Sequence, residues 1–322
     1  MTGPRRVLRV GLIGLGRWGK TLMRTLSEAP DVKLERISSR SPPPAELANA
    51  GRRHFTDWRE LLDPASIDGV FIATPPAVHA AMVKEAVARH IPVFVEKPLT
   101  MNLREAEEVK SAAKVNNALV MVDHTHLFSA AYRELKKQAG HWGAVRALDC
   151  IAGNMGPFRP DAPVLWDWGS HDMALCMDFL ETRPRCLSAR YLEQRGVDRA
   201  AGEVIELQME SGGAPVRMQL GNLIQPKTRY FAAYLEEALF VYDDQSEHKL
   251  KRYDAAPPFS RPAGEGEIIA TGGGTPLKNA ISEFCSAVRR GDTHHASIDL
   301  GVGVVAALAE CEAVLSQREQ RP

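Results

Sequence analysis

The sequence predicts an α/β protein, with an N-terminal doubly wound parallel sheet followed by an α+β domain built on an open, largely antiparallel sheet. Short β-branched runs alternate with helical patterns up to Asp123, which is typical of strand–helix–strand units. A glycine-rich turn follows the first run, and longer segments of alternating apolar and polar residues follow Asp123. We therefore expect one domain over residues 1–123 and a second over residues 124–322, with the final helices able to pack back on the first.

The expected strands of the first domain are short and apolar, and helical patterns separate them. The strands are expected at residues 7–13, 33–38, 69–73, 93–95 and 118–122. The helices are expected at residues 19–28, 45–50, 58–62, 78–90 and 103–116. Residues 41–44 read SPPP and predict an exposed loop after the second strand, because proline continues neither a strand nor a helix interior.

In the second domain a helix at residues 130–139 precedes segments of alternating apolar and polar residues. Strands are expected at residues 145–151, 204–210, 216–220 and 238–242. Helices over residues 275–290 and 300–317 close the chain, and the Gly/Pro-rich residues 255–275 predict a long surface loop.

Composition points to a small-molecule partner. The 40 Lys and Arg balance the 40 Asp and Glu, so no overall field attracts nucleic acid or an anionic membrane. The five cysteines are odd in number, widely spread and free of CxxC pairs, which indicates reduced thiols and no metal site. No export signal is apparent, and the longest apolar run, residues 302–309, is too short to span a bilayer. We expect a cytoplasmic protein.

The glycine-rich turn GLGRWG carries Gly14, Gly16 and Gly19 between an apolar run and a helical pattern. The first glycine permits the tight turn, the second lets the backbone approach a pyrophosphate, and the third allows close helix–strand packing. Backbone N–H groups at Arg17 and Trp18 would hold the phosphates at the helix N-terminus. The turn predicts a dinucleotide-binding Rossmann domain; the alternative is a glycine-rich turn without a ligand.

The ribose-reading position lies at the end of the second expected strand, where the sequence reads ISSR. No acid is present to bind an adenosine 2′-hydroxyl. The hydroxyl of Ser39 and the guanidinium of Arg40 suit a 2′-phosphate, which favours NADP and leaves NAD possible. The alternative is that both are solvated turn residues.

Further motifs follow in a fixed order: TDWRELL at residues 56–62, ATPPAVH at 73–79, VEKPL at 95–99 and WDWGSHD at 166–172. Together with the glycine turn they make the chain resemble the glucose-fructose oxidoreductase/inositol dehydrogenase/rhizopine catabolism (Gfo/Idh/MocA) family. The resemblance implies hydride transfer between nicotinamide and a sugar, polyol or nucleotide-sugar, with the chemistry between the two domains. It also implies a second domain that binds substrate and mediates homodimer or homotetramer contacts.

Cofactor contacts are expected at Thr74 and Pro75, because they follow a strand at its carboxyl end, where open α/β sheets bind ligands. His79 begins the next expected helix, and it either touches the cofactor or has a structural role. Glu96 and Lys97 of the EKP motif complete the predicted cofactor set.

Lys97 is also a predicted catalytic and substrate-binding residue. Pro98 limits the backbone of Lys97 to extended conformations, which restricts the direction in which its side chain points. A cation near the nicotinamide stabilises developing alkoxide charge, and the matching family position is catalytic. The alternative is a solvated surface lysine.

Asp167 and His171 are four residues apart and share one face if this stretch is helical. By resemblance, His171 exchanges the substrate proton and Asp167 orients substrate or histidine. The alternative is a helix cap and a packed histidine. The family often carries an acid three residues after this histidine, whereas here Ala174 occupies that position and Asp172 lies next to His171.

Asn154 and Arg159 lie in a Gly/Pro-rich loop before this pair and are predicted substrate contacts. His124, His126 and Tyr230 are further candidates. For each of these residues a surface or packing role is equally open.

Two alternative functions remain at this stage. One is a non-catalytic dinucleotide or sugar sensor on the same fold, and the other is a reductase of a non-sugar carbonyl, because fold does not fix substrate.

Overall fold

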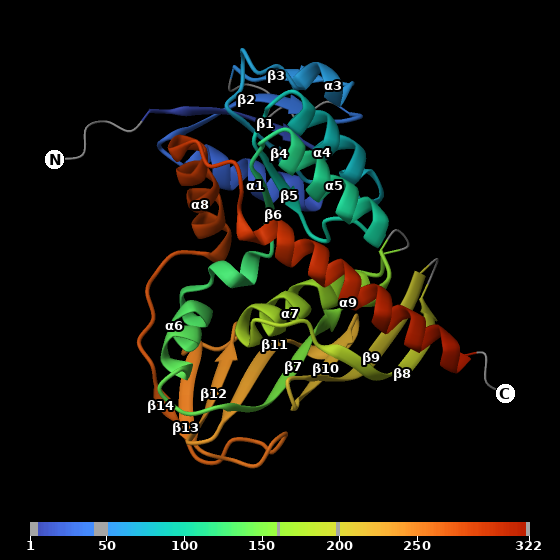
Figure 1. Ribbon diagram of the computed structural model, residues 1–322, viewed down its shortest axis with the longest axis vertical. Helices are drawn as coiled ribbons and strands as arrows, with labels where there is room; N and C mark the ends of the chain where they lie inside the picture. The colour runs from blue at the N-terminus through green and yellow to red at the C-terminus, as the bar shows by residue number, and fades with distance from the viewer. Residues whose placement is uncertain (1–5, 42–50, 160–161, 198–199, 320–322) are drawn as a thin grey trace. The chain divides into compact units, whose positions relative to one another are not determined.

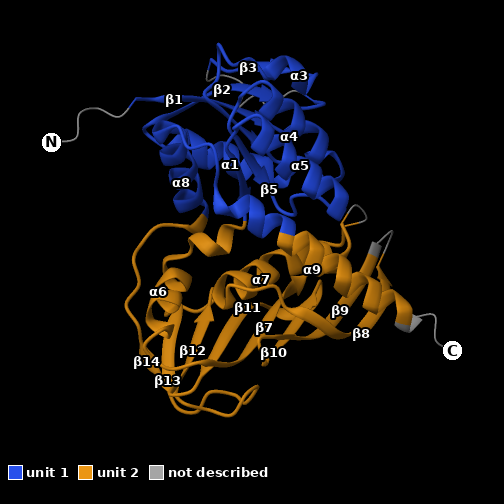
Figure 2. Ribbon diagram, viewed as in Figure 1, with its two compact units in different colours: residues 1–123, 277–302 blue, residues 124–276, 303–322 orange. Residues whose placement is uncertain are grey.

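The computed structural model describes residues 6–41, 51–159, 162–197 and 200–319 (Figure 1). The chain forms two compact units, residues 1–123 with 277–302 and residues 124–276 with 303–322 (Figure 2). The helix predicted at residues 45–50 and most of the loop predicted at 41–44 lie outside the described residues.

The first unit contains a six-stranded parallel sheet in the order β3-β2-β1-β4-β5-β6. Its strands are β1 (Leu8–Ile13), β2 (Val32–Ser38), β3 (Arg53–Phe55), β4 (Gly69–Ile72), β5 (Val93–Glu96) and β6 (Val120–Asp123). The order reverses between β1 and β4, the point at which such sheets bind ligands beyond their carboxyl ends. The predicted doubly wound parallel sheet is confirmed; β3, which has no apolar run, was not predicted.

Helices from both ends of the sequence pack on this sheet. They are α1 (Arg17–Glu28), α3 (Trp58–Leu61), the 3-10 turn η1 (Pro76–Val78), α4 (His79–Ala88), α5 (Leu103–Val115) and α8 (Pro276–Arg290). The ring of Phe284 on α8 lies 5.2 Å from that of Phe71 and 5.6 Å from that of Phe94, centroid to centroid. Gly69 leaves room for this ring, since a Cβ there would lie 3.2 Å from it.

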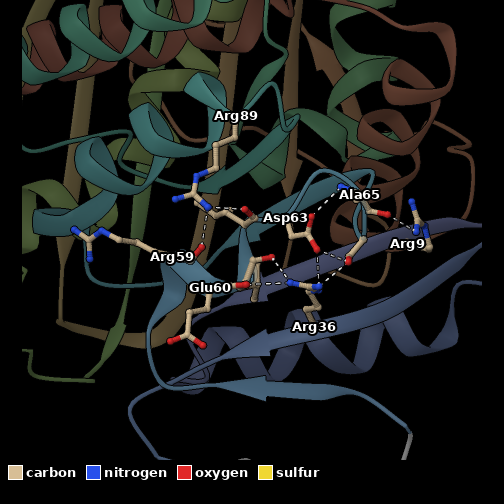
Figure 3. A network of polar contacts seen from close by, with 10 residues as sticks. Arg9, Arg36, Arg59, Glu60, Asp63, Ala65 and Arg89 are labelled. Atoms are coloured by element: carbon tan, nitrogen blue, oxygen red, sulfur yellow. Dashed lines mark hydrogen bonds and ion pairs between the residues drawn. The ribbon is translucent and has the colours of Figure 1, made fainter.

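A buried arginine fixes the segment between β3 and β4 (Figure 3). Arg36 of β2 donates to the carbonyl of Glu60 at 3.0 Å, to Asp63 Oδ2 at 2.8 Å and to Ser66 Oγ at 2.6 Å. These acceptors offset the cost of burying its charge. Arg89 of α4 donates to the carbonyl of Leu62 at 2.7 Å, so the segment is tied to a helix as well as to a strand.

The second unit contains an eight-stranded sheet in the order β14-β13-β12-β11-β7-β10-β9-β8. The strands are β7 (Val145–Met155), β8 (Arg185–Val197), β9 (Ala200–Ser211), β10 (Ala214–Gly221), β11 (Leu223–Leu235), β12 (Ala238–Asp243), β13 (Leu250–Asp254) and β14 (Glu267–Ile268). Among the described strands of this second sheet, only β7 and β10 pair in parallel, so the predicted largely antiparallel sheet is confirmed.

Helices cover one face of this sheet (Figure 1). They are the 3-10 turn η2 (Thr125–Phe128), α6 (Ala130–Ala139), α7 (Val164–Leu180) and the later part of α9 (Ala296–Glu319). A Cβ on Gly169 of α7 would lie 3.0 Å from Leu308 of α9 and 3.1 Å from Leu220 of β10, so α7 is packed between them. All five cysteines are free and buried.

Candidate cofactor and catalytic residues

The turn between β1 and α1 needs glycine at two of its positions. Gly14 has φ +96°, and a Cβ there would lie 2.5 Å from the carbonyl oxygen of Ala73. A Cβ on Gly19 would overlap the carbonyl of Gly14. Gly16 differs, because a Cβ there would have no atom within 4 Å. The middle glycine therefore faces open space, as the approach of a pyrophosphate to the backbone requires.

The N-terminus of α1 suits a phosphate. Gly16 is its N-cap, no side chain caps it, and its first turn carries no acidic residue. Its backbone N–H groups and the positive end of the helix dipole are thus available to an anion. Arg17 and Trp18 are exposed at this end. The described residues fit the pyrophosphate of a dinucleotide.

The ribose-reading segment follows β2. Arg40 is exposed, whereas Ser39 is half-buried and donates through Oγ to the Ser41 carbonyl at 2.5 Å. His54 Nε2 lies 3.1 Å from both the hydroxyl and the carbonyl of Ser39. No sequence pattern pointed to His54, because β3 is short and has no apolar run. Arg40 is the cation that this segment presents to solvent.

The end of β4 lies beside the glycine turn, since Thr74 Cγ2 would lie 3.0 Å from a Cβ on Gly14. Pro75 is exposed. His79 is buried, with Nε2 2.9 Å from the Thr74 carbonyl and Nδ1 3.0 Å from the Pro98 carbonyl. Burial lowers the pKa of His79. These contacts make His79 a link between two loops; a direct contact with cofactor stays a prediction.

Glu96 and Asp123 end the adjacent strands β5 and β6 and are partners in register. Glu96 accepts a hydrogen bond from Trp18 Nε1 of the glycine turn, and the charge of Asp123 acts on it. Burial, and then the charge of Asp123, raise the pKa of Glu96 well above its usual range, while Lys97 opposes this shift. Lys97 is the residue after Glu96 and is half-buried. The peptide bond between Lys97 and Pro98 is cis.

In the second unit α7 carries the predicted catalytic pair. Asp167 lies in its first turn, where Arg159 Nη1 is 3.3 Å from Asp167 Oδ1. The His171 ring lies one turn on, edge-to-face with the His126 ring at 5.0 Å between centroids. The structure thus brings Asp167 to Arg159 and His171 to His126, while Asn154 is half-buried near the end of β7.

Asp172, the acid next to His171, is paired with a strand. Its Oδ2 lies 2.8 Å from Arg229 Nη1 of β11, and the side chains are 0% and 7% exposed. The Arg229 guanidinium also lies 5.9 Å from the Trp168 ring. Arg229 was missed by sequence reasoning, because no motif marks it. This ion pair anchors α7 beside His171.

The remaining sequence candidates lie elsewhere or are buried. Tyr230 packs in the cluster around Tyr234, on the face of the sheet opposite to Arg229, because neighbouring strand residues point to opposite faces. His124 is buried. Within the described residues no group of three His, Cys, Asp or Glu is placed to hold a metal ion. None of the described helices has both the length and the apolar character needed to cross a membrane.

Comparisons with known proteins agree with this arrangement. The GFO_IDH_MocA family model, described as "Oxidoreductase family, NAD-binding Rossmann fold", matches residues 8–124. The chain is 32% identical over 254 residues to the uncharacterized oxidoreductase YrbE of Bacillus subtilis (strain 168). The matched region covers 76% of this chain and 68% of that protein. It is 29% identical over 331 residues to the scyllo-inositol 2-dehydrogenase (NAD(+)) of the same organism, covering 93% of each.

A solved structure extends the similarity to the second unit. The crystal structure of a protein assigned as an oxidoreductase from Magnetospirillum magnetotacticum MS-1 matches with a TM-score of 0.88 at 34% identity. The match covers 94% of this chain and 99% of that one.

Proposed function

Because the chain belongs to the Gfo/Idh/MocA family of oxidoreductases, we propose that it transfers a hydride between a nicotinamide dinucleotide and a carbinol or carbonyl carbon of a sugar, polyol or nucleotide-sugar. It is a dehydrogenase that acts on CH–OH groups. The observation that carries the proposal is the glycine turn, whose middle glycine faces open space at an uncapped helix N-terminus. Lys97 lies in the same unit as this turn.

We assign the proton chemistry to Lys97 and His171. When bound, the nicotinamide ring supplies or accepts the hydride. The Lys97 amine binds the reacting oxygen and stabilises negative charge that develops on it. His171 takes the hydroxyl proton in oxidation and returns it in reduction, because an imidazole titrates near neutral pH.

Asp167 and Arg159 are proposed to hold the substrate. As an ion pair they offer an acceptor and donors side by side, which suits neighbouring hydroxyls of a polyol. The partial cancellation of the Arg159 charge by Asp167 favours an uncharged sugar or polyol over a strongly anionic substrate. The similarity to an enzyme whose name specifies scyllo-inositol, a cyclic polyol, supports the same class.

For the cofactor we propose a preference for NADP. Residues 39–41, the described residues that follow β2, carry no acid to bind a 2′-hydroxyl, and the exposed Arg40 suits a 2′-phosphate. We also propose that copies of the chain associate as dimers or tetramers, which native mass spectrometry of the purified protein measures directly.

The deciding experiment for catalysis is Lys97→Met, assayed with NADP and NAD against a panel of sugars and polyols. We expect turnover to be lost while dinucleotide affinity, measured by calorimetry, stays close to that of the parent protein. Lys114→Met, at an exposed position on α5, is the matched control and should keep full activity. Unchanged turnover in Lys97→Met would overturn the assignment, and dinucleotide binding without redox change across the panel would indicate a sensor.

A further inference from the structure

Three residues far apart in sequence form a chain of contacts in the first unit. Trp18 belongs to the glycine turn and lies in the first turn of α1, and its indole Nε1 donates to Glu96 Oε1 across 78 residues of sequence. Glu96 ends β5 beside Asp123, its partner in register at the end of β6. The chain of contacts therefore runs from the predicted phosphate-binding turn to the strand end that precedes Lys97.

The two acids of this chain need a shared proton. Glu96 is 7% exposed and Asp123 is 0% exposed, so water does little to separate their charges. An ionised carboxylate only accepts hydrogen bonds, and two ionised carboxylates have no donor with which to bond each other. Two buried carboxyl groups at facing strand positions therefore interact favourably only if one of them carries a proton.

The surroundings of Glu96 favour its protonated form. Burial and the charge of Asp123 raise its pKa well above the usual range for a glutamate. Lys97 and the Trp18 indole act in the opposite direction with smaller effects. His79, on the neighbouring α4, is buried with a lowered pKa and so adds no cation here.

We infer that Glu96 is a positioning residue that works as a neutral acid. Its proton bonds to Asp123 while an oxygen accepts from Trp18, and this fixes the turn that holds the dinucleotide against the strand end that carries Lys97. The part that concerns cofactor rests on the proposed function. The pair keeps a single negative charge close to the Lys97 amine.

A neutral acid has a close substitute in glutamine, which gives a sharp test. In Glu96→Gln the amide N–H donates to Asp123 and the amide oxygen accepts from Trp18, so dinucleotide affinity should stay within about twofold of the parent value. Glu96→Ala loses both bonds and should weaken affinity by about tenfold or more. Trp18→Phe keeps an aromatic ring without the donor and should also weaken dinucleotide affinity. Because Trp18 is 41% exposed, this variant should fold like the parent protein.

Two spectroscopic measurements test the inference without any dinucleotide. Infrared spectra near neutral pH should show the carbonyl stretch of a protonated carboxylic acid, which shifts in protein made with isotope-labelled glutamate and is absent from Glu96→Gln. Fluorine NMR of protein containing fluorotryptophan, with the Trp18 signal assigned from Trp18→Phe, should show that signal displaced in Glu96→Ala and little changed in Glu96→Gln.

The outcomes separate this inference from the proposed function. If the parent protein binds no dinucleotide, the proposed function fails, while the infrared band and the Trp18 signal still decide the state of Glu96. An absent acid band, or Glu96→Gln as damaging as Glu96→Ala, overturns the neutral acid. Unchanged affinity and an unmoved Trp18 signal in Glu96→Ala overturn the positioning role.

Discussion

Gly14 faces the backbone of Ala73 so closely that a Cβ at position 14 would lie 2.5 Å from the Ala73 carbonyl oxygen. The end of β1 and the end of β4 therefore meet with no room for a side chain. Gly16, two residues on, faces open space. The same motif thus contains two glycines that the fold requires, Gly14 and Gly19, and one, Gly16, that leaves room for a ligand.

This contrast predicts opposite effects for two alanine substitutions. Gly14→Ala should lower the free energy of unfolding by about 1–3 kcal/mol, because it combines a positive φ with a close backbone contact. Gly16→Ala should change stability by less than about 0.5 kcal/mol yet weaken dinucleotide affinity by about tenfold, because its methyl group enters the space left for the pyrophosphate. Denaturant unfolding and calorimetry measure the two quantities. Equal dinucleotide affinity in Gly16→Ala and the parent protein would argue against a pyrophosphate at this turn.

Arg40 should set the choice between NADP and NAD. Arg40→Ala removes a charge-assisted contact with a 2′-phosphate, so NADP affinity should fall by about tenfold or more while NAD affinity stays nearly constant. Arg24→Ala, at an exposed position of α1, controls for the loss of one positive charge. The proposal of an NADP preference fails if Arg40→Ala weakens both cofactors equally or neither of them.

The sheets could be predicted from sequence where strands are apolar and short. β1, β4 and β5 are buried along most of their length and so appear as apolar runs between helical patterns. β8 is largely exposed and β11 opens with a polar, proline-containing stretch, so neither shows a regular alternation, and both were missed. β3 has only three residues, and His54 was missed with it.

Sequence patterns did not predict which side chains contact each other across different elements. Short recognisable motifs singled out Lys97, Asp167 and His171 as candidates, and their roles stay predictions. The contact between Trp18 and Glu96 joins the start of α1 to the end of β5, 78 positions apart, and the Asp172–Arg229 pair joins residues 57 positions apart. Such contacts follow from the packing of elements against each other, which periodicity within one element does not encode.

The stability of the first unit should depend on the protonation of His79. Burial lowers its pKa in the folded state, so the unfolded chain binds the proton more readily. This stabilisation is therefore present above the unfolded value of about 6.5 and is lost as the pH falls, by at most about 1.4 kcal/mol per pH unit. His79→Gln does not titrate, and its free energy of unfolding should depend less steeply on pH between about pH 7.5 and pH 5.

The matched control for this measurement is His248→Gln, at an exposed position, which should keep the pH dependence of the parent protein. Identical slopes for His79→Gln and the parent protein would show that His79 does not carry this effect.

The effects of replacing Asp172 and Arg229, which form a buried ion pair, should be strongly coupled in the free energy of unfolding. Asp172→Asn and Arg229→Met each leave one charge buried without its counter-ion, and each should lower the free energy of unfolding by about 3–5 kcal/mol. The double variant leaves neither charge, so its loss should be well below the sum of the two single losses. The exposed pair of Lys278 and Glu28, with 2.8 Å between charged atoms, is the control and should show coupling of about 0–1 kcal/mol. Additive losses at Asp172 and Arg229 would mean that the two charges are not coupled, and that α7 is held beside β11 by its apolar contacts alone.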